Sequence, residues 1–241
     1  MTVLTLQSKA VSLTRRQAGL SAPTSRTGTF YSAISNVDFR IEKGNPGAVA
    51  IRSHFAQHSF ISHCDFNIGD GLAGIYDVGN EIEDLRFYGG QYGITSGRTS
   101  PGWPMMMVDT WFYGQEKAAV LTREVGFAVV GMYAENVPVV FETEENTVDR
   151  LYVENAIFRK VSKAAVIVST EDNTFSQMNL KNVHCSDVPV LVSFRGSGRE
   201  TAGEGKNYLV KDYVFGFVYD DMAARPRFPE EFDIVPLHNL F

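Results

Sequence analysis

Two acidic residues, Asp77 and Glu81, stand four positions apart between two stretches whose composition suits short β-strands. A carboxylic acid can protonate the leaving oxygen of a glycosidic bond, while a second carboxylate or an amide holds the attacking water. We therefore predict that Asp77 and Glu81 are catalytic, with one of them acting as general acid. The alternative is that Asp77 only ends a strand beside ordinary glycine-containing turns.

Polar and aromatic side chains close to these carboxylates provide the means to bind a sugar. Aromatic rings offer surfaces on which sugar rings stack, and His or Gln can position a substrate or a water. The predicted substrate-binding residues are His54, Gln57, His58, Tyr76, Tyr92 and Trp103. Trp103 lies in a Pro/Gly-rich segment that lengthens one repeat, and packing of its ring on that repeat is an equally weighted alternative.

A second candidate pair, Asp84 and Asp109, occupies one position of successive repeats. Neighbouring strands lie about 4.8 Å apart, so we expect the two carboxylates about 5 Å apart, with the pKa of one raised. Arg86, Tyr88, Trp111 and Tyr113 are expected beside them. The same column contains Asn36, His63, Val130, Asn155 and Asn182. A structural ladder of polar side chains explains such a column without chemistry, and this pair therefore ranks second.

A repeat positions all of these residues. Seven short segments end at Phe39, Phe66, Phe87, Phe112, Tyr133, Phe158 and Cys185, at steps of 27, 21, 25, 21, 25 and 27 residues. A second apolar stretch follows each segment after a turn, as in GAVAI (47–51) and KAAVIV (163–168). Short strands and Gly/Asn/Asp turns at a period of about 24 residues are typical of a parallel β-helix. We predict an all-β fold, a right-handed, single-stranded parallel β-helix of about seven coils.

The register of the repeat predicts which side chains point inward. Strand side chains alternate between faces, so the aromatic column and the residues two positions earlier should both face the interior. That second column reads Val37, Cys64, Leu85, Thr110, Gly131, Ala156 and Val183. Cys64 and Cys185 then point inward about 24 Å apart, too far for a disulfide. We predict two free, buried thiols.

The ends of the chain depart from the repeat. Residues 1–29 are rich in Ser and Thr and are predicted to form an N-terminal cap or an extended arm before the β-helix of residues 30–194. The remainder, 195–241, divides into a polar loop, a last partial coil at 207–221 and a proline-containing tail. We expect this tail to run extended over the surface or into a partner.

Composition excludes several classes of function. The net charge of −6 and pI of about 5.4 argue against nucleic-acid binding. Since no apolar run approaches the roughly 18 residues of a membrane span and the first residues lack a continuous apolar core, neither a membrane protein nor a signal peptide is predicted. No metal or cofactor is predicted; acidic clusters leave a calcium site open, but no DxDxD loop supports one.

The stretch FYSAISNVDFRIEKGNPGAVAIRSHFAQHSFISHCDF, followed by GIYDVGNEIEDLRFYGGQYGI, resembles the pectate-lyase-like β-helix superfamily. It is most similar to the branch that contains family 55 exo-β-1,3-glucanases, through a Gly/Ala-rich strand, the AQ segment in RSHFAQHS, and the "GI" and "GG" pairs. The resemblance covers about residues 30–194. The GDGxTDDTxAIQxA helix that opens many members is missing, so the chain resembles the middle of a longer protein or a reduced member.

This resemblance implies a carbohydrate-active protein in an extracellular or periplasmic location. A glycoside hydrolase that acts on an extended polysaccharide, β-glucan or pectin-like, is the expected function. A polysaccharide lyase and a non-catalytic carbohydrate-binding or structural module are the alternatives. A polysaccharide or oligosaccharide is the expected partner, and further copies or domains of a longer chain are also compatible with the pattern.

Overall fold

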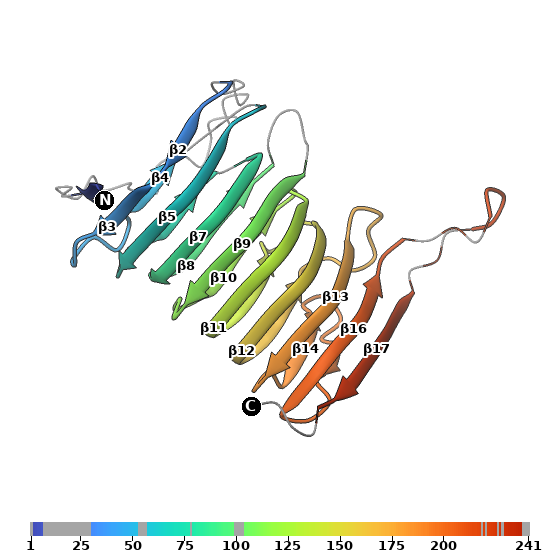
Figure 1. The fold of residues 1–241 in the computed structure, drawn as a ribbon. Coiled ribbons are helices and arrows are strands. Elements are labelled where there is room, and N and C mark those ends of the chain that lie inside the picture. Colours follow the sequence, from blue (N-terminus) through green and yellow to red (C-terminus); the bar gives the residue numbers. More distant parts are fainter. Residues whose placement is uncertain are drawn as a thin grey trace.

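The structure, a computed structural model, describes residues 2–6, 30–52, 57–77, 79–98, 104–217, 219, 221–225, 227 and 229–237. Within these residues all regular secondary structure is β-strand, and no helix is present that could cross a membrane. Parallel strands stack into a β-solenoid of about six turns (Figure 1). The predicted all-β parallel β-helix is confirmed, and it is about one turn shorter than expected.

Each turn gives one strand to each of two stacks. The first stack contains β2 (Ala33–Ser35), β3 (Val37–Ile41), β5 (Phe60–Gly69), β7 (Glu81–Gly89), β9 (Met105–Tyr113), the first parts of β11 (Phe127–Thr143) and β12 (Arg150–Val168), and β13 (Gln177–Ser186). The second contains β4 (Val49–Arg52), β6 (Ala73–Tyr76), β8 (Tyr92–Gly97), β10 (Ala118–Arg123), the later parts of β11 and β12, and β14 (Val190–Phe194). A short strand, β1 (Thr2–Leu6), pairs in parallel with β3.

Ladders of equivalent side chains fill the interior. The rings of Phe39, Phe66, Phe87 and Phe112 stack at centroid distances of 4.8 to 4.9 Å, which is the spacing of hydrogen-bonded strands. Facing them, one register column of the second stack buries Ile51, Ile75, Ile94, Val120, Phe141, Val166 and Val192. Each turn therefore covers the apolar surface of the next, and the core is continuous along the solenoid.

Two glycines of the second stack make room for this phenylalanine ladder. A Cβ atom on Gly74 would lie 2.8 Å from a ring carbon of Phe87, and one on Gly93 would lie 2.5 Å from a ring carbon of Phe112. Contacts this short exclude any side chain without displacement of the ring. The two Gly-Ile pairs in the sequence are thus required by packing inside the solenoid.

The fifth segment departs from the predicted register by one residue. Tyr133 pairs with Trp111 and lies half-buried on the outside, whereas Ala134 pairs with Phe112 and is buried. The prediction that Tyr133 belongs to the interior stack is therefore wrong. Phe158, which pairs with Ala134, is fully buried as predicted.

A backbone requirement explains this shift. Gly131 has a φ of 73° and occupies the left-handed position that Asp109 occupies in the preceding turn. The prediction put Val130 there, but a β-branched residue is strained at positive φ, whereas glycine is not. Because Gly131 takes the left-handed position, Met132 points into the interior where Gly131 was predicted to point, and Met132 is 2% exposed.

The C-terminal end runs antiparallel. β15 (Glu200–Ala202) pairs antiparallel with β14, β16 (Asn207–Phe215) with β13, and β17 (Glu230–Pro236) with β16. The hairpin between β14 and β15 reverses the chain within the second stack, so the chain re-enters the first stack in the opposite direction. Residues 207–215 are therefore not a further parallel coil, which corrects the prediction for this segment.

Both cysteines are free and buried, as the register predicted. The Cys64 thiol donates a hydrogen bond to the carbonyl oxygen of Ser62 at 3.1 Å. Burial raises the pKa of both thiols, that of Cys185 to about 12. They behave as small apolar residues of the core.

Candidate functional site

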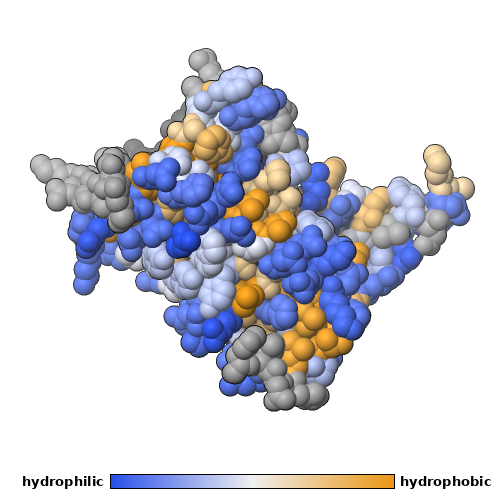
Figure 2. Space-filling model, in the orientation of Figure 1, coloured by the Kyte–Doolittle hydropathy of each residue, from blue (hydrophilic) through white to orange (hydrophobic). Residues whose placement is uncertain are grey.

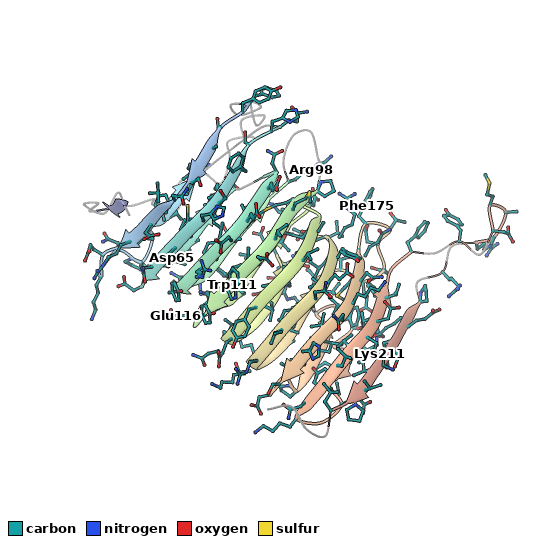
Figure 3. The ribbon with its side chains drawn as sticks, viewed as in Figure 1. Asp65, Arg98, Trp111, Glu116, Phe175 and Lys211 are labelled. Atoms are coloured by element: carbon teal, nitrogen blue, oxygen red, sulfur yellow. The ribbon has the colours of Figure 1, made fainter. Side chains whose placement is uncertain are left out.

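The outer surface of the first stack carries a group of large side chains on three successive turns, which we call the aromatic face. It consists of Arg86, Tyr88, Trp111, Tyr113 and Tyr133, from β7, β9 and β11. The parallel register aligns Arg86, Trp111 and Tyr133 in one column across the three strands. Tyr88 and Tyr113 form a second column two residues further along, which strand alternation places on the same outer surface. Figure 3 shows Trp111 between the ends of its strand, and Figure 2 shows polar and apolar surface interspersed on the side of the molecule drawn.

The rings of the aromatic face pack against one another along the solenoid. The ring centroids of Tyr88 and Tyr113 lie 5.3 Å apart with planes at 8°, and those of Tyr113 and Tyr133 lie 5.5 Å apart at 39°. The guanidinium carbon of Arg86 lies 4.5 Å from the centroid of Trp111. Because their faces cover each other, the tyrosines offer a ligand their ring edges and phenolic hydroxyls. Burial raises the pKa of all three tyrosines, so these hydroxyls remain neutral donors.

Acidic residues lie at one end of the aromatic face. Arg86 joins two of them, with Nη2 3.0 Å from Asp84 Oδ1 and Nη1 3.7 Å from Asp65 Oδ1. Burial raises the pKa of Asp65, Arg86 lowers it, and the nearby carboxylates of Asp38 and Asp84 raise it further. Asp65 therefore keeps its proton to a higher pH than an ordinary aspartic acid. The sequence pattern alone assigned Asp65 no role.

A hydrogen-bonded network closes the other end. Tyr133 Oη donates to Glu135 Oε2 at 2.6 Å, and Lys160 Nζ lies 2.8 Å from Glu135 Oε1. Arg159 Nη1 donates to Tyr133 Oη at 3.3 Å. The hydrogen bonds from Lys160 and Tyr133 hold the pKa of Glu135 below its ordinary value. Donors and acceptors are thus held in place at both ends of the aromatic face.

The column of Asp84 and Asp109 has a structural basis. Asn36, His63, Asp84, Asp109, Gly131, Asn155 and Asn182 all have φ between 47° and 73°. We call these seven residues the left-handed column. Gly, Asn, Asp and His adopt this conformation more readily than other residues, which accounts for the types present. Asn182 Nδ2 also donates to Asn155 Oδ1 at 2.7 Å, and a Cβ on Gly131 would lie 2.1 Å from Asp109 Oδ1.

Asp77 and Glu81 belong to different stacks. Asp77 follows β6 in the second stack, where its amide donates to the carbonyl of Thr95 at 2.9 Å and its Oδ2 lies 3.4 Å from Arg52 Nη2. Glu81 begins β7 in the first stack and is exposed, in register with Phe60. The assignment of these two carboxylates as a catalytic pair stays a prediction.

The predicted substrate-binding residues fall into two groups away from the aromatic face. His58 stacks on Tyr31 with centroids 4.9 Å apart, and the carbonyl of Gln57 accepts a hydrogen bond from the Tyr31 amide at 3.3 Å. Tyr76 and Tyr92 lie in the second stack, with Arg52 5.4 Å from the Tyr76 ring and Lys117 5.6 Å from the Tyr92 ring. His54 and Trp103 lie outside the described residues.

Within the described part of the chain, no group of three His, Cys, Asp or Glu side chains is arranged to hold a metal ion. A comparison with protein-family models gives no match, and a comparison with curated proteins gives none either. The fold defines the class of the protein, a parallel β-solenoid, and a solenoid by itself does not specify a function. Any indication of function must therefore come from the side chains of the aromatic face.

Proposed function

We propose that this protein binds an extended carbohydrate chain on the aromatic face. One observation carries the proposal: ring edges, phenolic hydroxyls and fixed charges alternate along one outward surface over three successive turns. Apolar edges suit the C–H faces of sugar rings, and neutral tyrosines, Glu135 and Arg159 supply donors and acceptors for hydroxyl groups. A polymer that follows the solenoid would meet the same side-chain types on each turn.

Binding is tested with a panel of soluble polysaccharides by affinity electrophoresis, followed by calorimetry on the best oligosaccharide. Trp111→Ala and Tyr113→Ala should each weaken binding by about tenfold or more, equivalent to about 1.4 kcal/mol. Phe60→Ala is the matched control, because Phe60 is an exposed aromatic residue on the same stack but outside the aromatic face. Absence of binding to any polymer, or equal affinity of all three variants, would contradict the proposal.

Hydrolysis of the bound chain is a second candidate function. The raised pKa of Asp65, beside Asp84 and a shared arginine, supports it because a general acid must be protonated near its working pH. Asp65 would protonate the leaving oxygen and Asp84 would act as its partner carboxylate. The assay follows reducing ends and unsaturated products on the same panel, which also separates a hydrolase from a lyase.

Four variants separate the candidate carboxylates. Loss of a general acid lowers turnover by roughly 10²–10⁴-fold, so Asp65→Asn should abolish most activity if this end of the aromatic face is catalytic. Asp77→Asn and Glu81→Gln test the pair predicted from the sequence, and Asp109→Asn tests the left-handed column. Loss in Asp77→Asn or Glu81→Gln alone would move the chemistry away from the aromatic face.

A further inference from the structure

A hollow lies away from the aromatic face, at the edge of the solenoid where β11, β12 and β13 begin. It has a volume of about 430 Å³ and is bordered on its far side by the end of β16. Its walls are mostly apolar and include Phe127, Leu151, Met178, Val214 and Phe215. Such a concave, largely apolar space with a few polar groups is typical of a small-molecule site.

Arg150 supplies the charge of this hollow. Its Nε and Nη2 atoms pass over Gly126, each 3.7 Å from where a Cβ would stand. Arg98, Arg123 and Arg195 each pair with a glutamate, whereas within the described residues the Arg150 guanidinium has neither an ion pair nor a hydrogen bond. Arg150 is therefore available to an anionic ligand. A guanidinium binds a carboxylate through two parallel hydrogen bonds, so a carboxylate is the anion that suits it best.

Asn179 supplies an unsatisfied acceptor in the same hollow. Its Oδ1 atom is buried and accepts no hydrogen bond. Tyr152 pairs with Asn179 and Arg150 with Gln177, so Asn179 lies one strand over and two residues along from Arg150. Strand geometry makes this a Cα separation of about 8 Å. A buried acceptor without a donor is costly, and a ligand that donates a hydrogen bond there would remove the cost.

A neighbouring hollow of about 260 Å³ shares Arg150 and extends the site. It is lined by Arg98, Glu124, Val148, Asp149 and the ring of Phe175, which is 59% exposed. Figure 3 labels Arg98 and Phe175 along this edge of the solenoid. The cation thus stands at one end of the apolar hollow, and the second hollow beyond it is lined mainly by charged side chains, so the site favours a ligand with a charged group at one end and a flat apolar body in the first hollow.

We propose that this edge binds a small aromatic carboxylate that also carries a hydrogen-bond donor, of the hydroxycinnamate class. The carboxylate pairs with Arg150, the ring lies on the apolar walls, and the hydroxyl donates to Asn179 Oδ1. Charge complementarity, the apolar walls and the unpaired acceptor each select one part of this ligand. A simple anion such as phosphate satisfies only the first of these features.

Ligand-observed NMR titration with 4-hydroxycinnamate tests the site, and a Kd on the order of 1 mM or tighter is expected for so small a ligand. Two analogues remove one feature each, 4-hydroxycinnamyl alcohol the charge and cinnamate the hydroxyl. Both should bind at least about fivefold more weakly. Inorganic phosphate should not compete at equal concentration.

Variants complete the test. Arg150→Gln should weaken binding of 4-hydroxycinnamate by about tenfold or more, and Arg123→Gln, which removes another exposed positive charge elsewhere, should leave the affinity unchanged. Thermal unfolding of both variants verifies that they remain folded. No saturable binding to the wild-type protein, equal binding by Arg150→Gln, or full competition by phosphate would overturn the proposal. None of these outcomes depends on carbohydrate binding at the aromatic face.

Discussion

The parallel body of the solenoid and its antiparallel C-terminal end are stabilised in different ways. In the body, the same position of every turn contacts its equivalent in the next, as in the ladder from Phe39 to Phe112. At the end, one carboxylate organises unlike groups: Glu230 accepts hydrogen bonds from Thr201 and Tyr213 and pairs with Arg199. Repetition stabilises the body through many similar contacts, whereas the end depends on a few individual residues.

This difference also explains how stacking stops. A further parallel turn would have to pair with β13 and β14, but the antiparallel strands β16 and β15 already occupy those edges. The last strand, β17, carries Glu230, Glu231 and Asp233, and charged residues on an edge strand oppose pairing with other chains. The antiparallel end therefore acts as a terminator of the repeat.

The largest expected effect breaks the body. Phe87→Ala should lower the free energy of unfolding by about 3–5 kcal/mol, because it leaves a cavity between Phe66 and Phe112, and none of these three rings has exposed surface. Denaturant unfolding monitored by circular dichroism measures the change. Phe232→Ala, at an exposed ring of β17, is the control and should cost less than about 1 kcal/mol. Similar losses for both would remove the distinction between body and end.

The next effect acts on the end alone. Glu230→Gln should cost about 2–4 kcal/mol locally, since the side chain is 14% exposed and its loss of charge leaves Arg199 unpaired. Native-state hydrogen exchange should show that amides of β16 and β17 lose protection while those of β5, β7 and β9 keep theirs. Glu231→Gln, at a more exposed carboxylate of the same strand, should change neither group. Uniform loss of protection throughout the chain would show that body and end unfold as one unit.

A smaller effect is expected at the left-handed column. Asn155→Ala should destabilise the protein by about 1–2 kcal/mol, because alanine is strained at a φ of 55° and cannot accept the hydrogen bond from Asn182. Asn155→Gly removes the same hydrogen bond without backbone strain and should be the more stable of the two variants. Chemical denaturation of the pair measures the difference, and equal stability would show that the backbone conformation does not determine the residue type there.

The smallest effect concerns pH. The pKa of Glu135 is lowered in the folded protein, so its ionised form contributes stability above the ordinary value of 4.5, and this contribution is lost as the pH falls through the folded pKa. Glu135→Gln should therefore be less stable than the wild type by less than about 1 kcal/mol at pH 7. The difference between the two proteins in thermal unfolding should shrink as the pH is lowered below 4.5. A difference that grows toward low pH would have the wrong sign for this linkage.

Sequence periodicity was sufficient to predict the fold because equivalent residues are visible without coordinates. Four ladder phenylalanines, the inward cysteines and the outward positions of Arg86 and Trp111 all follow from spacing and alternation. The fifth turn was misaligned because Tyr133 resembles the ladder aromatics in type. The register of this turn is determined by backbone conformation. The glycine at 131, with its positive φ, indicates that register more reliably than the position of an aromatic residue does.

Strand direction and pKa values could not be predicted in the same way. Alternating apolar residues in β16 are compatible with either direction, and the reversal depends on the hairpin that precedes it. The raised pKa of Asp65 depends on burial and on the carboxylates of two neighbouring turns. Likewise, aromatic residues were expected to offer ring faces to a sugar, but stacking between turns leaves their edges outward.

The left-handed column also bears on how such a chain can change its length during evolution. Steps along it range from 21 residues, between His63 and Asp84, to 27, between Asn155 and Asn182, yet the column stays in register. The connecting loops absorb the difference. A whole turn is therefore a modular unit: duplication or deletion of a segment that starts and ends at the column would preserve the lateral contacts of the turns on either side.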